Sequence, residues 1–97
     1  MIVDDNGLQF DGPKDYVMKV ADLAGRWTCL GLEVITVDGH DVEALREAFL
    51  RETDRPKVII AKTVKGKGVH FAENEVTWHT GRLTDELYQE AVRDIND

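Results

Sequence analysis

The sequence predicts an α/β fold in which helices flank a partial parallel sheet, giving three layers. Segments rich in β-branched residues alternate with segments of helical periodicity, which is typical of a parallel sheet covered by helices. One segment, residues 58–61, is an unbroken apolar run of the kind found in strands that are buried on both faces. The chain has 97 residues, and we treat residues 1–97 as one small, partial domain.

The first half of the chain is expected to hold two strands and one helix. Residues 1–3 are an apolar strand stub, and glycine-containing turn signals after them predict a loop over residues 4–16. Residues 33–37 read Glu-Val-Ile-Thr-Val and predict a second strand. Between these strands, apolar residues with helical spacing predict a helix that Gly31 closes. They are Val20, Leu23, Ala24, Trp27 and Leu30.

The next helix and strand carry clearer boundary signals. Asp41 is a good N-cap for a helix over residues 42–49, and Pro56 follows as a stop. Residues 57–63 contain the apolar run and predict a third strand.

Beyond the third strand the periodic pattern is lost and then returns. Residues 64–82 hold three glycines, two histidines and a tryptophan without a clear period. A loop of this length in a compact domain is often functional. Residues 84–95 are helical in pattern, with two acidic residues at the positive, N-terminal end. Ligands of parallel sheets bind beyond the carboxyl ends of strands, so the loops after the strands are the candidate sites.

Composition and charge exclude several classes of function. The chain has 19 acidic and 12 basic residues, a net charge of −7, which argues against nucleic-acid binding through a broad basic face. The single cysteine, Cys29, excludes an internal disulfide, and its apolar surroundings in the sequence predict a small core residue. We see no signal peptide and no apolar run near the ~20 residues that span a bilayer, so we expect no membrane partner and a cytoplasmic location.

The first candidate site follows the first strand, where the sequence reads Asp4-Asp5-Asn6-Gly7-Leu8-Gln9. Carboxylate and amide oxygens suit Mg²⁺ or Ca²⁺, and a backbone carbonyl two residues on can join the same coordination shell. The same composition is common in simple polar turns. Both interpretations therefore stand on the residues alone.

The second candidate site follows the third strand and reads Lys62-Thr63-Val64-Lys65-Gly66-Lys67-Gly68. Three lysines can balance a diphosphate, and two glycines let the backbone approach a ligand closely. The segment lacks the endings of a P-loop and of a dinucleotide fingerprint. A solvated basic turn is the alternative interpretation.

The third candidate site is Trp78-His79, in the irregular segment. A histidine there can donate a hydrogen bond to an oxyanion or move a proton near neutral pH. Alternatively, it only fixes the conformation of the loop. His40, in a tight turn before a helix, is expected to be structural, and for His70 both interpretations stay open.

Taken together, these segments resemble the diphosphate-binding domain of transketolases, in the order in which the family has its motifs. One segment resembles the end of the family's thiamine diphosphate motif and reads Asp5-Asn6-Gly7-Leu8-Gln9-Phe10-Asp11-Gly12. The next two blocks are resembled by residues 37–41 and 60–69, and the last by Glu73-Asn74 with Trp78-His79. These blocks span nearly the whole chain. The most specific of them are Lys-Thr-Val-Lys-Gly-Lys-Gly and the Trp-His pair that follows it.

The resemblance implies thiamine diphosphate and Mg²⁺ (or Ca²⁺) as cofactors, and it implies roles for four residues. Asn6 would give its side-chain oxygen to the metal and contact the diphosphate, and the backbone carbonyl of Leu8 would complete that metal shell. Lys65 would lie near the cofactor. His79 would contact the diphosphate and face the substrate channel, which makes it the candidate catalytic residue.

The resemblance also implies an incomplete thiamine-diphosphate-binding fold that works only with partner chains. The family's Gly-Asp-Gly, whose aspartate is the main metal ligand, is not in this chain, and neither Asp4 nor Asp5 is an obvious substitute. The pyrimidine-binding domain, with the glutamate that activates the cofactor, is also absent. We therefore expect partner chains that carry both parts. In addition, Thr80 separates His79 from Gly81, whereas the family histidine is usually followed by glycine.

The activity implied by the resemblance is transfer of a two-carbon ketol unit between sugar (phosphate) substrates, performed by the assembly. One alternative is a component of another thiamine diphosphate enzyme, of the deoxyxylulose-phosphate synthase or 2-oxoacid dehydrogenase type. A second alternative is a non-catalytic structural subunit. A phospho-receiver domain is the most distant alternative, suggested by the acidic residues 2–6 and by Lys62 after a strand.

Overall fold

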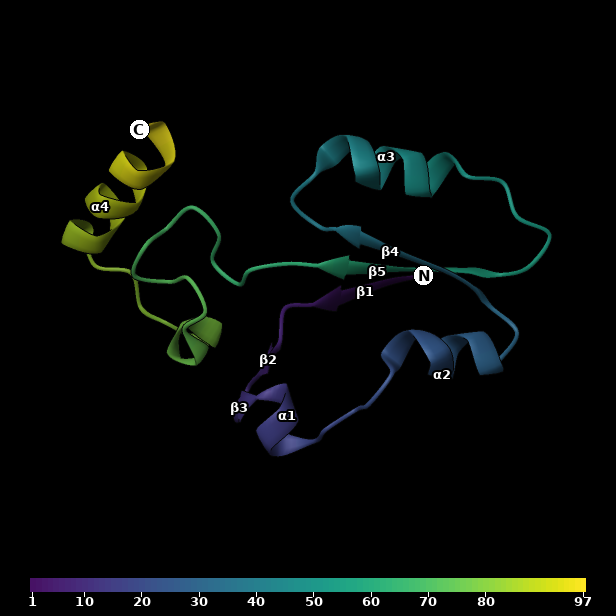
Figure 1. Cartoon of the computed structure of the whole chain (residues 1–97). Coiled ribbons are helices and arrows are strands. Elements are labelled where there is room, and N and C mark those ends of the chain that lie inside the picture. The colour runs from purple at the N-terminus through teal and green to yellow at the C-terminus, as the bar shows by residue number, and fades with distance from the viewer. The chain divides into compact units, whose positions relative to one another are not determined.

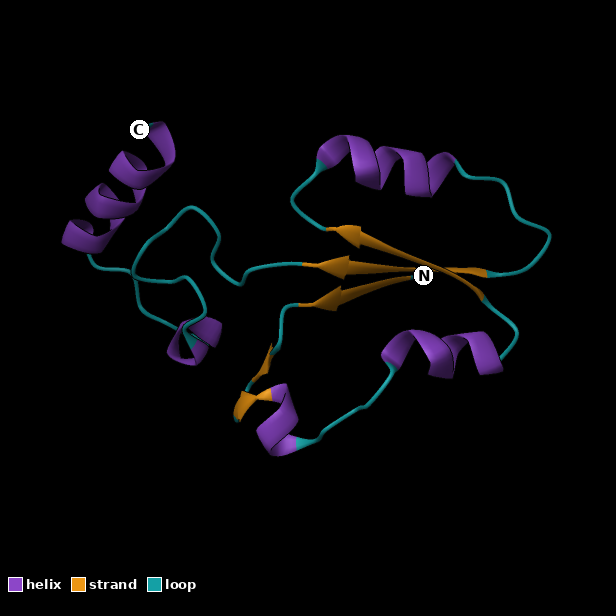
Figure 2. Ribbon diagram, in the orientation of Figure 1, coloured by secondary structure: helices purple, strands orange, loops and turns teal.

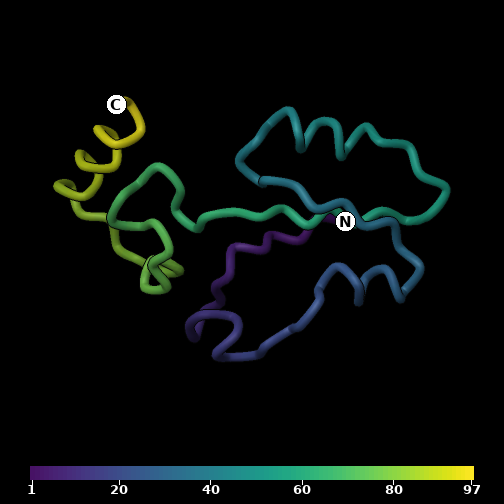
Figure 3. Tube along the Cα trace, in the orientation of Figure 1, coloured from purple at the N-terminus to yellow at the C-terminus, as the bar shows by residue number.

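A computed structural model describes residues 1–97 and confirms the α/β class. The chain divides into two compact units. The sheet unit contains residues 1–6 and 18–63, and the loop unit contains residues 7–17 and 64–97. The backbone passes from one unit to the other directly after residues 6, 17 and 63 (Figures 1 and 3).

The sheet unit is built on three parallel strands, β1 (Ile2–Asp5), β4 (Glu33–Asp38) and β5 (Lys57–Lys62). Their order in the sheet is β1-β5-β4, so β5 is central (Figure 2). Ile59 of β5 pairs with Ile2 on one side and with Ile35 on the other. This register brings the carboxyl ends of all three strands to one edge of the sheet.

The core of the sheet unit is the central strand itself. Val58, Ile59 and Ile60 are at most 2 % exposed, and Ala61 is also buried. Consecutive side chains of a strand point to opposite faces, so four buried residues in a row require cover on both faces. The predicted strand with two buried faces is therefore confirmed.

Two helices provide that cover. The helices α2 (Leu23–Cys29) and α3 (Val42–Leu50) lie on opposite sides of the sheet, α2 against β4 and α3 against β4 and β5 (Figure 1). The buried Ala48 of α3 joins the core. The predicted N-cap is present, because Asp41 Oδ1 accepts a hydrogen bond of 3.0 Å from the backbone N–H of Ala44.

Lys57, the first residue of β5, caps the other end of α3. Its Nζ donates to the carbonyl oxygens of Ala48, Phe49 and Arg51 at 2.9, 2.8 and 2.8 Å. The last carbonyls of a helix have no partner within the helix and carry partial negative charge, which suits an ammonium group. One side chain thus anchors the end of α3 to the start of the central strand.

The loop unit contains only short elements besides its C-terminal helix. The strands β2 (Leu8–Gln9) and β3 (Gly12–Pro13) form a two-residue antiparallel hairpin, followed by α1 (Lys14–Val17). A 3₁₀ helix, η1 (Val76–His79), precedes α4 (Asp85–Asn96). Thr84 caps α4, since its side chain accepts a hydrogen bond from the N–H of Leu87.

Residues 64–75 form a compact loop that is closed by its own hydrogen bonds. The backbone N–H of Asn74 donates to the carbonyl of Lys65 at 3.0 Å, and the N–H of Val69 donates to that of Gly66 at 3.0 Å. Gly66 has a φ of +70°, and a side chain there would run into the carbonyl of Ala72. The irregular segment is therefore ordered by turns and by close backbone packing.

Two expectations from the sequence are wrong. The residues expected to form one loop, 4–16, contain the end of β1, the β2–β3 hairpin and most of α1. Cys29, expected in the core, is exposed, because it lies in the last turn of α2, next to the exposed Leu30. Helical spacing defines a face, but what covers that face depends on the neighbouring elements. None of the helices in the structure is long and apolar enough to cross a lipid bilayer.

Candidate functional site

The first candidate residue, Asn6, lies directly after β1, at the carboxyl edge of the sheet. Its Nδ2 donates to Asp4 Oδ2 at 3.4 Å, and the other carboxylate oxygen of Asp4 accepts a hydrogen bond from Thr63 Oγ1. Thr63 follows β5, which pairs with β1. The nitrogen end of this amide is turned toward Asp4, and the oxygen of an amide is a type of ligand that metal ions accept.

Asp5 is the buried member of the same cluster. It is 9 % exposed and forms an ion pair with Lys62, which lies opposite it in the β1–β5 register. Both aspartates at the end of β1 thus have partners at the end of β5 or directly after it.

Leu8, the second candidate metal ligand, lies on β2 of the loop unit. It pairs with Pro13, and the hairpin is closed by a hydrogen bond of 2.9 Å from the N–H of Lys14 to the carbonyl of Gly7. Gly7 has a φ of +76°, a left-handed conformation that favours glycine. The hairpin therefore restrains the backbone path of Leu8, whose carbonyl is the group of interest.

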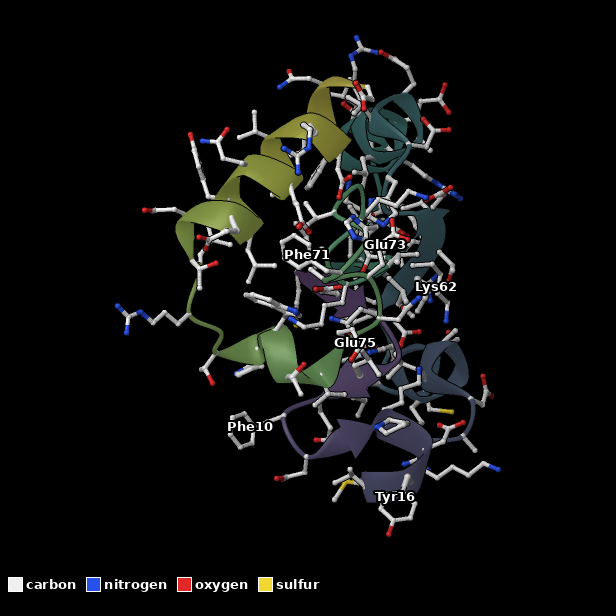
Figure 4. The ribbon with its side chains drawn as sticks, turned by 90° about the vertical axis from the view of Figure 1, so that its left-hand side faces the viewer. Phe10, Tyr16, Lys62, Phe71, Glu73 and Glu75 are labelled. Atoms are coloured by element: carbon white, nitrogen blue, oxygen red, sulfur yellow. The ribbon has the colours of Figure 1, made fainter.

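Lys65 belongs to the compact loop that follows β5. The loop presents Lys65 and Lys67, while Gly68 has a φ of +90° and open space where a side chain would lie. The N–H of Gly68 is already donated to Glu73 Oε1 at 2.9 Å, and Figure 4 labels Glu73 on this loop. The loop can therefore meet an anion with lysine side chains, and Glu73 holds part of its backbone in place.

His79 is the last residue of η1, and aromatic contacts surround this element. The imidazole and the ring of Phe10 meet in a T-shaped arrangement, with centroids 5.1 Å apart and an angle of 85° between the ring planes. Trp78 packs against Phe71 at 5.1 Å, and a side chain at Gly81 would run into the indole of Trp78. The glycine after Thr80 is thus required by the tryptophan, and His79 stays exposed, where a ligand can reach it.

The structure brings three of the four predicted residues into one unit. Leu8, Lys65 and His79 belong to the loop unit, and Asn6 belongs to the sheet unit, two residues before Leu8 in the chain. The chain has no cluster of three or more His, Cys, Asp or Glu side chains that could hold a metal. Amide oxygens and backbone carbonyls are both hard ligands of the kind that Mg²⁺ accepts.

Sequence reasoning missed one polar cluster in the loop unit. Asp94 of α4 accepts a hydrogen bond from the backbone N–H of His70 at 3.0 Å and lies 2.6 Å from its ring Nδ1, while Glu90 lies 4.0 Å from Nε2. The hydrogen bond from the His70 ring, followed by that from its backbone, holds the pKa of Asp94 below its ordinary value. No sequence pattern joins residues 24 positions apart, so only the fold reveals this cluster.

Comparison with known families gives a match along almost the whole chain. The family described as transketolase, thiamine diphosphate binding domain, matches residues 1–95. The match includes both units and all four predicted site residues.

Individual relatives and a solved structure agree with this match. The chain is 37 % identical over 100 residues to an apulose-4-phosphate transketolase subunit of Phocaeicola vulgatus, and the match covers 99 % of this chain and 35 % of that protein. It is 30 % identical over 95 residues to a 6-deoxy-6-sulfo-D-fructose transketolase subunit of Clostridium sp., covering 95 % and 34 % respectively. A transketolase crystal structure from Campylobacter jejuni superposes with a TM-score of 0.88 at 27 % identity, over 98 % of this chain and 15 % of that one. The chain thus spans about a third of the length of the two subunits.

Proposed function

The chain belongs to the transketolase thiamine diphosphate binding domain family, and we propose that it supplies the later part of the diphosphate pocket in a larger transketolase-like enzyme. One observation supports this proposal most directly. Leu8, Lys65 and His79 fold into one compact unit, and the chain enters that unit directly after Asn6. These three residues are far apart in the sequence, and the fold places them in the same compact unit.

The proposed metal ligands are Asn6 Oδ1 and the carbonyl oxygen of Leu8. The ion is Mg²⁺ (or Ca²⁺), and the remaining ligands come from the diphosphate and from an aspartate outside this chain. The hydrogen bond from Asn6 Nδ2 to Asp4 supports the assignment, because it engages the nitrogen end of the amide. Lys65, on the glycine-containing loop, offsets the negative charge of the diphosphate.

The proposed catalytic residue is His79. Bound thiamine diphosphate supplies the carbon nucleophile and electron sink for cleaving and forming the bond next to a ketose carbonyl. The imidazole of His79 holds the substrate by a hydrogen bond and moves a proton to or from its oxygen.

We further propose that the active species is an assembly, located in the cytoplasm, that transfers a two-carbon ketol unit between sugar phosphates. The partner chains carry the upstream Gly-Asp-Gly segment and the pyrimidine-binding domain. The names of two relatives support this proposal, since each is the name of a transketolase subunit.

Calorimetry with thiamine diphosphate and Mg²⁺ on the assembled complex tests the metal assignment. We expect Asn6→Ala to weaken Mg²⁺-dependent cofactor binding at least ~10-fold, because loss of even an outer group at a metal site typically costs 10–100-fold in affinity. The matched control is Asn96→Ala, whose side chain donates to the carbonyl of Val92 within α4. Unchanged affinity in Asn6→Ala would overturn the metal assignment.

A non-catalytic structural subunit makes a different prediction. In that case the double variant Asn6→Ala, His79→Ala leaves both cofactor affinity and turnover of the assembly intact. Product analysis with sugar phosphates and with pyruvate separates ketol transfer from the chemistry of the other thiamine diphosphate enzymes.

A further inference from the structure

We propose that Phe10 is a positioning residue that holds the imidazole of His79 in its working orientation. This inference depends on the proposed role of His79 and adds a residue that the proposed site does not include. It also gives the β2–β3 hairpin a second task besides carrying Leu8.

The contact geometry is the first argument. The rings of Phe10 and His79 meet edge-on at a centroid distance of 5.1 Å, within the range that aromatic pairs prefer. Such pairs are favourable beyond the apolar area that they bury. The contact therefore favours one orientation of the imidazole over others.

The exposure of Phe10 is the second argument. Its side chain is 62 % exposed, and Figure 4 shows it extending away from the ribbon of the hairpin. A phenyl ring this exposed adds little to a core, yet it contacts the ring of His79. The contact with His79 is therefore the interaction of this side chain that the proposal uses.

The backbone on both sides of the contact is restrained. Phe10 follows β2 at the tip of the hairpin, where Gln9 pairs with the buried Gly12. His79 ends η1, in which the N–H of Trp78 donates to the carbonyl of Glu75 at 3.2 Å. Both rings therefore extend from ordered backbone, which is a requirement for one ring to orient another.

A ring contact orients a histidine in a useful way. It restrains the imidazole plane through ring packing and needs no conventional hydrogen bond from the imidazole, whose nitrogens are the groups suited to a substrate hydroxyl or phosphate oxygen. Leu8 lies on the same hairpin as Phe10. The hairpin therefore carries both the backbone carbonyl proposed as a metal ligand and the ring that contacts His79. A misplacement of about 1 Å at such a group can cost ~100-fold in rate.

The contact itself is tested by NMR on the full chain labelled at histidine. We expect Phe10→Leu to shift the ring proton signals of His79, because the ring current of the phenyl group is removed, and to leave those of His40 and His70 in place. Phe10→Tyr keeps an aromatic ring and should keep the His79 signals. The matched control is Tyr16→Leu, an aromatic residue of the same unit that is 87 % exposed, and it should move none of them.

The functional consequence is tested on the assembled enzyme. We expect Phe10→Leu to lower kcat on the order of 10-fold with cofactor affinity unchanged, and Phe10→Tyr to restore kcat. If Phe10→Leu does not fold, Phe10→Met carries the same test. Unmoved His79 signals, an unchanged kcat, or an equal loss of cofactor affinity would each overturn the positioning role. Wild-type kcat in His79→Gln would instead overturn the proposed function of His79, whatever Phe10 does.

Discussion

The sheet unit and the loop unit are held together by different forces. All five buried apolar residues belong to the sheet unit; they are Ala48, Val58, Ile59, Ile60 and Ala61. The loop unit has no side chain in that class, and relies on aromatic pairs, helix capping and turn hydrogen bonds. Stability is thus concentrated in one unit, and three of the four candidate site residues lie in the other. Binding loops are commonly drawn from the less stable parts of a fold.

The largest expected effect comes from the core of the sheet unit. Ile59→Ala should lower the free energy of unfolding by about 2–5 kcal/mol, because it removes a buried side chain and leaves a cavity. Chemical denaturation followed by circular dichroism measures the loss. The half-buried Leu87 of the loop unit provides the comparison variant, Leu87→Ala, which should cost clearly less. Equal losses would show that the two units do not differ as described.

The second effect concerns the polar cap of the sheet unit. Lys57→Met keeps most of the apolar stem but removes three hydrogen bonds to the end of α3. The loss should be about 2 kcal/mol, typical of a hydrogen bond to a charged group together with carbonyls left unpaired. Amide exchange of α3 should rise more than that of β5. Lys19→Met, at an exposed position, serves as the control, and a similar loss there would refute the capping role.

The third effect separates two glycines of the compact loop. Gly66→Ala and Gly68→Ala both place a side chain at positive φ, which costs about 1–2 kcal/mol. Only at Gly66 does the new side chain also meet the backbone of Ala72. Hydrogen exchange across residues 64–75 should therefore rise further in Gly66→Ala, with β5 little changed. The idea that this loop is closely packed fails if Gly68→Ala is as damaging.

The smallest effect is a pH dependence in the loop unit. The pKa of Asp94 is lowered by its hydrogen bonds from His70, so ionised Asp94 favours the folded loop. This contribution is present above the ordinary value of 3.8 and is lost as pH falls through the lower, folded pKa. In Asp94→Asn, hydrogen exchange of the His70 amide should be faster than in the wild type at neutral pH. The additional increase in exchange that the wild type shows when the pH is lowered to acid values should be absent from the variant. If exchange in Asp94→Asn rises at acid pH as much as in the wild type, the pH dependence belongs to another titratable group.

The sequence predicts the sheet unit better than the loop unit, and the reason is physical. The buried run of β5 and the Asp41 cap are local signals that survive folding. The β2–β3 hairpin escapes prediction because strands of two residues show no periodicity. The exposure of Cys29 escapes it because the environment of that residue depends on which element covers the last turn of α2.

The candidate site is likewise predictable only in part from the sequence. Asn6, Leu8, Lys65 and His79 are identified from motifs, because residue type and spacing carry that information. The partners of these residues are not, since Phe10 meets His79 and Thr63 meets Asp4 only after the chain has folded. Contacts between residues distant in sequence have no local signature, and they are what the structure adds.

The central position of β5 also governs how the sheet unit can form during translation. The outer strands β1 and β4 are synthesised first, yet each pairs only with β5. Within this chain, neither strand has a pairing partner until the ribosome releases residues 57–62. Arrival of that one segment then completes both strand pairings at once. Because these contacts join residues far apart in sequence, the nascent sheet unit should be slow to fold and exposed to chaperones until that moment.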